Sequence, residues 1–363
     1  MNLDSLLNEI KDKYGYTDEL VNAIKITIPL MVAEYGENSI DDILRLFQKT
    51  RIFATSDMGY ENRKIIEKQM IGNYNSHIKS EEIDPYQNGD SDPGSYYSFE
   101  TLYDEEMNII GEARWLVVKD MKDSFNEEGY SNLFGTTINM PYFIHEINHA
   151  FAMQNAIYRK KDNIIESKHG MYEQVQSFNK DNGQISLIEE SNAHIILEEA
   201  INEKITQDML VNLLNAKEYS EVESMLSSIK HVSSSYSSIL IGLANKFSNI
   251  LGKDRLMQYR KDNNKEIIDE FNLLASQGEI GKKYVDNENP FEYFSKKSFE
   301  LFRLKCECYK MSIEEYSRRS KELMVGAFAP LCSYQEIKFG TTDLSKFEET
   351  RNELLGIEKE KTI

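Results

Sequence analysis

The stretch Pro141–Phe151 of this 363-residue chain reads PYFIHEINHAF. Its apolar residues recur three and four positions apart, and this spacing predicts a helix with one apolar side. No helix breaker interrupts the following residues, so we expect the helix to cover residues 142–159. On such a helix His145 and His149 project from the same face, one turn apart.

The same stretch contains the pattern His-Glu-x-x-His, in which each named residue has a chemical role. Two imidazole nitrogens at this spacing can bind one zinc ion, and Glu146 then lies beside the metal as a general base toward water. Histidine is rare here, with six in the chain. A chance match to the pattern is expected in roughly 0.01 of such chains. The alternative is a core helix with two incidental histidines, which would bury three polar groups that each need a partner.

A catalytic zinc site takes three protein ligands and leaves the fourth position to water. A longer form of the motif would supply Gly and a third His, but this chain has Ala152 and Asn155 at those positions. We therefore expect the third ligand on a later helix, where Glu199 and Glu203 are four residues apart and share a face. The alternative interpretation of these two residues is an ordinary, solvated acidic face.

These two segments resemble the active-site helices of gluzincin metallopeptidases, the thermolysin-like and aminopeptidase branch of the zincins. In that group the second helix carries a glutamate ligand followed by Ala or Gly, and in the thermolysin type an acidic residue follows four positions on. Glu199-Ala200-Ile201-Asn202-Glu203 is similar to this pattern. The resemblance implies that Glu199 is the third ligand and that Glu203 bonds a ligand imidazole. A second alignment, which makes Glu203 the ligand, stays open.

The resemblance covers only these two helices and nothing before residue 136. The separation between His149 and Glu199 is longer than in the thermolysin type. A hairpin predicted at residues 171–188 could fill this separation, because Asn182-Gly183 lies between two strand-like runs.

The remaining pattern predicts an α+β, zincin-like fold with a small mixed sheet and a largely helical C-terminal half. Residues 1–55 have the apolar spacing of helices, and turn residues concentrate in 80–95. Strand-like runs at 96–103 and 109–118 predict an antiparallel hairpin that carries Trp115. Further helices are expected at 192–216, 219–231, 234–251, 254–276, 291–310 and 312–326, with Pro290 and Pro330 near boundaries.

We divide the chain into three parts on this basis. An N-terminal helical segment covers 1–80, a zincin-like catalytic core covers 95–210, and a helical C-terminal subdomain covers 211–363. In zincins an extended substrate aligns along an edge strand, for which residues 109–118 or 136–140 are candidates.

Peptide hydrolysis also needs a donor to the oxyanion, for which His231 and Tyr236 are the candidates on a later helix. The other histidines have simpler interpretations. We expect His194 to be buried or to cap a helix, His169 to lie in a turn with Gly170, and His77 to lie on the surface.

Lys and Arg number 42 against 61 Asp and Glu, a net charge of −19. Nucleic acids and anionic membranes bind clustered basic residues, so we expect neither as a partner. Apolar residues make up 40% and aromatic residues 11%, which excludes the disordered class of protein.

The N-terminus lacks the basic start and unbroken apolar stretch of a secretory signal. The most apolar runs, 26–33 and 237–244, are too short to cross a bilayer. Three cysteines, Cys306, Cys308 and Cys332, fit a reducing compartment better than a disulfide framework. These features predict a cytoplasmic protein, with leaderless export left open.

The sequence thus favours a Zn²⁺-dependent metallopeptidase that acts on a peptide or protein substrate. The alternative is a catalytically silent zincin-like module for binding or regulation. A structural metal site or a metal-free helical scaffold is the third possibility.

Overall fold

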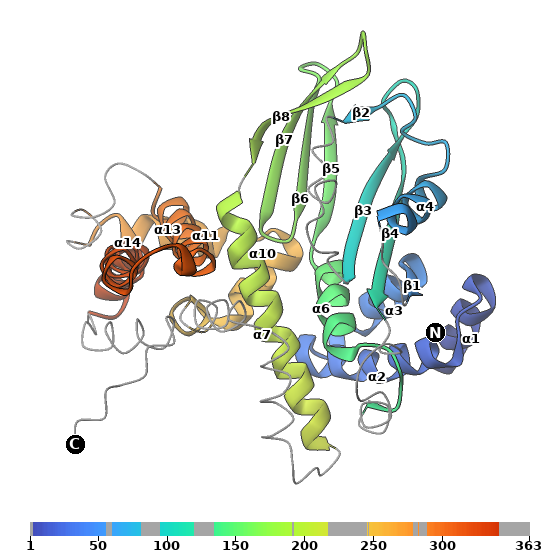
Figure 1. The fold of residues 1–363 in the computed structure, drawn as a ribbon, viewed down its shortest axis with the longest axis horizontal. Coiled ribbons are helices and arrows are strands. Elements are labelled where there is room, and N and C mark those ends of the chain that lie inside the picture. Colours follow the sequence, from blue (N-terminus) through green and yellow to red (C-terminus); the bar gives the residue numbers. More distant parts are fainter. Residues whose placement is uncertain are drawn as a thin grey trace. The chain divides into compact units, whose positions relative to one another are not determined.

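The fold is shown in a computed structural model (Figure 1). The structure describes residues 3–55, 60–80, 95–119, 134–190, 192–216, 245, 247–278, 282 and 289–340. These residues form an α+β protein, as the sequence predicts, but with two small sheets in place of the single mixed sheet that we expected. Two compact units are distinguished: one takes its described residues from 1–168, 174–189 and 205–222, the other from 169–173, 190–204 and 223–363. No described helix is long and apolar enough to cross a membrane.

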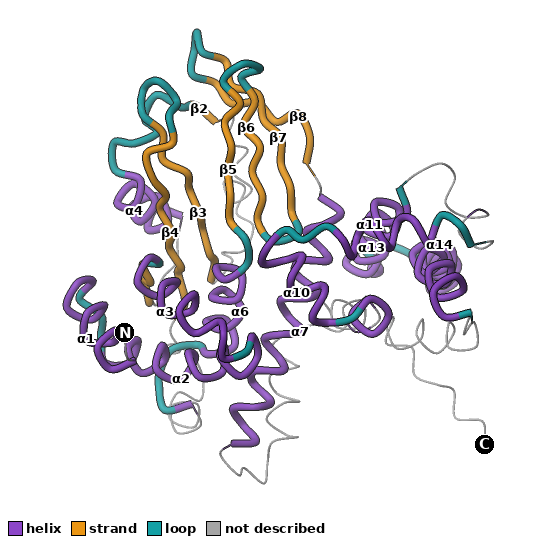
Figure 2. Tube along the Cα trace, turned by 180° about the vertical axis from the view of Figure 1, so that it is seen from behind, coloured by secondary structure: helices purple, strands orange, loops and turns teal. Residues whose placement is uncertain are grey.

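The first unit begins with three helices that contact one another pairwise (Figure 2). They are α1 (Leu3–Tyr14), α2 (Asp18–Tyr35) and α3 (Ile40–Lys49). Their buried residues include Leu6, Leu7 and Ile10 in α1, at the predicted helical spacing. The α2 helix starts at a side-chain cap, because the Thr17 hydroxyl accepts a hydrogen bond from the Leu20 N–H. Helices are therefore confirmed over most of residues 3–49.

A three-stranded sheet follows, with the order β1 (Arg51–Thr55), β4 (Ile109–Lys119) and β3 (Ser95–Tyr103). β3 and β4 form the predicted antiparallel hairpin, in which Trp115 lies opposite Ser98. β1 corrects the expectation of helix up to residue 55, since it pairs in parallel with β4. Its partner lies some sixty residues away, so local apolar spacing could not reveal the pairing.

One face of this sheet is covered by α4 (Tyr60–Ile71). On that face Trp115 and Val117 are buried, and Ile66 of α4 packs against their cluster. Glu100 lies opposite Ala113 and therefore points to the same face. Burial raises the pKa of Glu100 to about 7, and the charge of Glu67 on α4 adds to this rise.

The second sheet has five strands in the order β2-β8-β7-β6-β5. The strands are β2 (Lys79–Ser80), β5 (Gln154–Arg159), β6 (Ile164–His169), β7 (Tyr172–Asn179) and β8 (Gln184–Glu190). Short turns join β5 through β8 into a meander. The hairpin predicted at 171–188 is confirmed as β7 and β8, and Gly183 supplies the positive φ of 74° in its turn.

The second unit is mostly helical. Its elements are the part of α7 (Asn192–Ala216) up to residue 204, α10 (Lys253–Asp262), α11 (Glu266–Ala275), α13 (Pro290–Cys306) and α14 (Ile313–Phe339). The helix predicted at 192–216 is confirmed. The helix predicted at 254–276 is two helices, because Asn263 takes the left-handed conformation that ends α10. The helix predicted at 219–231 and most of the one at 234–251 lie outside the described residues.

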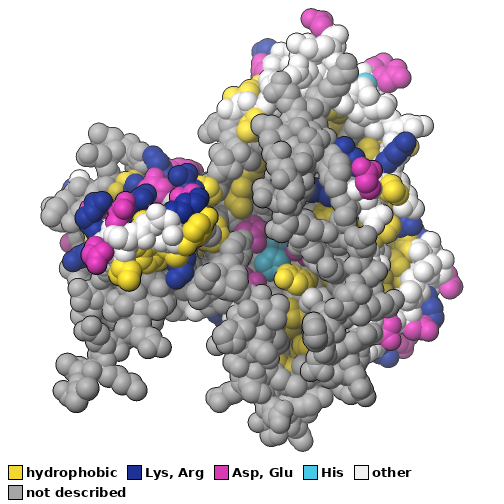
Figure 3. Space-filling model, viewed as in Figure 1, with side chains coloured by type: hydrophobic (Ala, Val, Ile, Leu, Met, Phe, Trp, Pro, Cys, Tyr) yellow, Lys and Arg dark blue, Asp and Glu magenta, His cyan; other side chains and the backbone are white. Residues whose placement is uncertain are grey.

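The last helix, α14, is longer than the predicted 312–326 and continues through Pro330 to Phe339. A proline in a helix removes one backbone hydrogen bond, which usually ends the helix. Here Pro330 lies in an unbroken run of buried residues from Gly326 to Tyr334. Packing against α11 and α13 offsets the lost bond. On the outer surface of α13 and α14, Lys, Arg and Glu side chains are mixed (Figure 3), and Arg318 pairs with Glu322.

The raised pKa of Glu100 predicts a pH-dependent cost to stability. A carboxyl group whose folded pKa is raised costs nothing below its unfolded value of about 4.5, and its full cost appears above about 7. The Glu100→Gln protein should therefore gain about 3 kcal/mol of unfolding free energy over wild type at pH 8 and nothing at pH 4. Urea unfolding at both pH values measures this. The exposed Glu105→Gln is the control, and an equal gain at both pH values would contradict the assignment.

Candidate metal centre

The helix that carries His-Glu-x-x-His is α6 (Met140–Phe151). Its buried side includes Phe143, Ile144 and Ile147, which are not exposed at all. The opposite stripe holds Tyr142, His145, Glu146 and His149, all of which are partly or fully exposed. The apolar spacing thus orients the motif away from the core of the first unit, as the sequence predicts.

α6 ends earlier than predicted. The chain becomes extended at Ala152, and Gln154–Arg159 is strand β5 rather than helix. The Gln154 side-chain NH₂ donates to the carbonyl of His149 at 3.0 Å, which satisfies a carbonyl group of the last helical turn. Neither Gly nor Pro marks this helix end in the sequence, so the spacing of breakers could not reveal it.

A buried asparagine inside the motif fixes α6 in the first unit. Asn148 is fully buried, and its Oδ1 accepts a hydrogen bond from the Tyr35 hydroxyl of α2 at 3.0 Å. The Tyr35 ring also packs on Phe151, with centroids 4.5 Å apart. α6 is therefore held against α2 by a polar and an aromatic contact at neighbouring positions.

The other end of the Asn148 amide reaches α7. Its Nδ2 lies 3.5 Å from Thr206 Oγ1 and 3.5 Å from Met209 Sδ, both in the part of α7 that belongs to the first unit. Thr206 and Met209 are three residues apart and share one face of α7. Glu199 lies seven residues before Thr206, two helical turns along, and so lies on nearly the same face.

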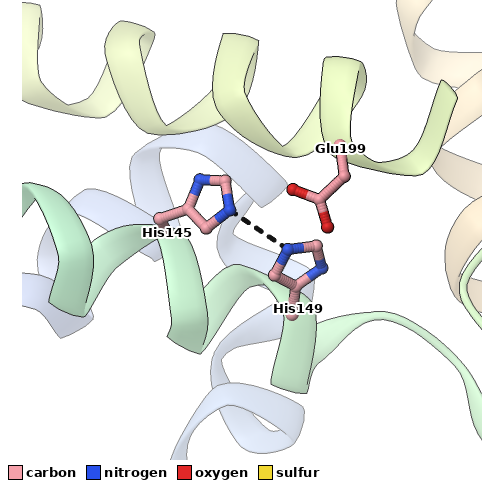
Figure 4. Close-up of side chains that lie close together, drawn as sticks. All are labelled: His145, His149 and Glu199. Carbon is pink, nitrogen blue, oxygen red and sulfur yellow. Dashed lines mark hydrogen bonds between the residues drawn. The ribbon is translucent and has the colours of Figure 1, made fainter. Parts of the chain in front are cut away.

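His145, His149 and Glu199 form a group of side chains whose ligand atoms all lie within 4.8 Å of one another (Figure 4). Within the part of the chain that the structure describes, no other three His, Cys, Asp or Glu residues gather in this way. All three side chains are partly exposed. Histidine and acidic side chains also lie together at the surface in the space-filling view (Figure 3).

The donor set and its spacing fit a zinc ion. The two Nε2 atoms lie 3.2 Å apart, at hydrogen-bonding distance (Figure 4). Two nitrogens that bind one tetrahedral zinc at 2.0–2.1 Å would be separated by about 3.3 Å. Two imidazoles with one carboxylate are also a ligand set that catalytic zinc sites use.

Of the two acidic candidates on α7, Glu199 belongs to this group and Glu203 does not. Glu146 lies beside His145 on the exposed stripe of α6, with a partly exposed side chain. The ligand and base roles of these residues stay predictions.

The strand expectations for substrate alignment need correction. Residues 109–118 form β4, the central strand of its sheet, and residues 136–140 are no strand but contain one isolated bridge at Ile138. The edge strand that contacts α6 is β3. Sheet order depends on the distant β1, which the sequence pattern did not identify.

The remaining histidines of the described residues do not lie with His145, His149 and Glu199. His194 is buried as expected, with Nε2 3.0 Å from Glu292 Oε1 and its ring against Phe291. His77 is half-buried rather than on the surface. The candidates His231 and Tyr236 lie outside the described residues.

His169 ends β6, and Gly170 makes the expected turn with a φ of 57°. Burial lowers the pKa of His169 to about 4, although the charge of Glu198 acts in the opposite direction. This imidazole is therefore neutral at neutral pH.

No protein-family model, curated protein or solved structure matches this chain. The resemblance to gluzincins rests on the segments around His145–His149 and Glu199–Glu203 alone.

The Asn148 amide should matter for stability although it lies at a variable position of the motif. Asn148→Ala removes the acceptor of Tyr35 and leaves a small cavity, so the free energy of unfolding should fall by about 2–3 kcal/mol. Urea denaturation followed by circular dichroism measures the change. Asn155→Ala, at an exposed position of β5, is the matched control and should stay within about 0.5 kcal/mol of wild type. Equal stability of both variants would show that Asn148 does not anchor the helix.

Proposed function

We propose that this protein is a zinc-dependent metallopeptidase with a zincin-like fold. His145, His149 and Glu199 bind the metal, and Glu146 is the general base. The observation that carries the proposal is the convergence of the two imidazoles and the Glu199 carboxylate within 4.8 Å, beside a glutamate at the second position of the motif. The α+β architecture agrees with it.

When bound, zinc supplies Lewis-acid polarisation of the scissile carbonyl and lowers the pKa of a coordinated water. The protein's own part in proton transfer falls to Glu146. Its carboxylate accepts the proton of the attacking water and then donates it to the leaving amine nitrogen. One glutamate can carry out both proton transfers because they occur one after the other on the same side of the scissile bond.

In the proposed peptidase, β3 aligns the extended peptide substrate. β3 is one of the two edge strands of its sheet among the described residues, and it contacts α6. An extended peptide that adds beside β3 would gain main-chain hydrogen bonds while its side chains alternate between the two faces.

Metal analysis tests the ligand set. The wild-type protein, stripped with a chelator and reloaded, should bind about one zinc per chain. His145→Ala and Glu199→Ala should weaken binding by roughly 100-fold or more, because each removes a ligand. Glu203→Ala should keep the stoichiometry. If Glu203→Ala abolishes binding and Glu199→Ala does not, the ligand is Glu203.

Cleavage profiling tests the chemistry. Glu146→Gln keeps the shape of the side chain and removes its basicity, so zinc binding should persist while cleavage of a peptide library falls by about 10²–10⁴-fold. Each protein is assayed with and without added zinc. A wild-type protein that binds zinc but cleaves no peptide is a binding or regulatory module instead. A wild-type protein that binds no zinc contradicts the proposal altogether.

A further inference from the structure

A buried ion pair lies directly beside the proposed ligand Glu199, within the second unit. Arg260 of α10 is 1% exposed at its side chain, and its Nε donates to Glu198 Oε1 at 2.7 Å. Its Nη2 donates to Oδ1 of the fully buried Asn202 at 2.7 Å. One guanidinium therefore binds two side chains of α7 that are four residues apart.

The second oxygen of Glu198 is also occupied. Its Oε2 accepts a hydrogen bond from the backbone N–H of Met171 at 3.1 Å, in the turn between β6 and β7. Gly170 precedes Met171, and a Cβ atom at Gly170 would collide with the Glu198 carboxylate. The turn thus approaches α7 as closely as it does because glycine occupies this position.

The contacts of Arg260 restrain α7 on a face that Glu199 does not share. Glu198 and Asn202 lie on one face, and Glu199 is turned from Glu198 by about 100° around the helix axis. A fork that binds positions 198 and 202 fixes both the rotation of the helix and its position along the axis. The direction in which the Glu199 side chain leaves the helix follows from these two quantities.

Stability alone does not explain this arrangement. A buried ion pair costs so much desolvation that apolar residues of similar size often do as well or better. In some proteins buried polar or charged groups specify one geometry among several, and the five donors of a guanidinium suit that purpose. Other ion pairs of this unit, such as Arg255 with Glu270, are partly exposed.

We propose that Arg260 is a positioning residue for Glu199, acting through Glu198 and Asn202 to set the rotation of α7. The inference rests on the proposed metal site. It adds that zinc affinity depends on an arginine 61 positions beyond the ligand, which does not touch the metal. Groups that orient a ligand in this way typically contribute 10–100-fold to metal affinity.

The test measures zinc affinity by competition with a chelator of known affinity. Glu198→Gln/Arg260→Met removes both charges together, leaves no buried charge unpaired, and keeps an acceptor for the Met171 N–H. Its zinc dissociation constant should rise about 10-fold or more. The melting temperature of the metal-free double variant should stay close to that of the metal-free wild type. The loss of zinc affinity would then come from the position of Glu199 and not from a general loss of stability. Arg260→Lys keeps the charge but loses the fork, so its affinity should lie between wild type and the double variant.

Arg255→Met is the matched control, because it breaks an ion pair of the same helix that does not reach α7. It should leave zinc affinity unchanged. Folded Arg260→Lys and double variants with wild-type affinity would overturn the positioning role alone, as would equal losses in the control. If the double variant does not fold, Arg260→Lys decides. A wild-type protein without zinc overturns both proposals, whereas a zinc-binding wild type without cleavage overturns only the peptidase.

Discussion

The buried Asn148 amide is the contact on which the arrangement of the candidate site depends. It accepts from Tyr35 on α2 and reaches Thr206 and Met209 on α7, so one side chain relates three helices. A buried amide without partners costs more than a hydrogen bond gains. The three helices are therefore coupled: a shift of any one would leave part of this amide unpaired.

The candidate ligands His145, His149 and Glu199 depend for their positions on the contacts that restrain α6 and α7. α6 contributes two imidazoles from its exposed stripe, while its apolar stripe fills the core of the first unit. α7 is restrained twice, by Asn148 near Thr206 and by Arg260 at Glu198 and Asn202. Glu199 directly follows Glu198 in the chain, so it lies beside the second restraint.

Sequence patterns predicted the parts that depend on near neighbours. Contacts between residues close in the chain form the helices α1 and α7, the hairpin of β3 with β4 and the turn at Gly183. Patterns of neighbouring residues therefore predict them. The predictions failed where contacts between residues far apart in the chain determine whether a segment is helix or strand. β1 pairs across some sixty residues, and Pro330 remains helical because its surroundings are buried. The end of α6 is a local exception: the Gln154 side chain donates to the carbonyl of His149, five residues away, and no Gly or Pro marks this end in the sequence.

The helical spacing of the residues already placed His145, Glu146 and His149 on one side of a helix, because 3.6 residues per turn leaves no other arrangement at that spacing. It also gave Glu199 and Glu203 as the two candidates for a third ligand. The grouping of Glu199 with the imidazoles came from the tertiary fold, since the two glutamates lie one turn apart on one face and spacing cannot distinguish them. The roles of Asn148, Glu198 and Arg260 in holding the helices also came from the tertiary fold. The bonds from Asn148 to Thr206 and from Arg260 to Glu198 and Asn202 span 58 to 62 residues, and no local pattern carries that information.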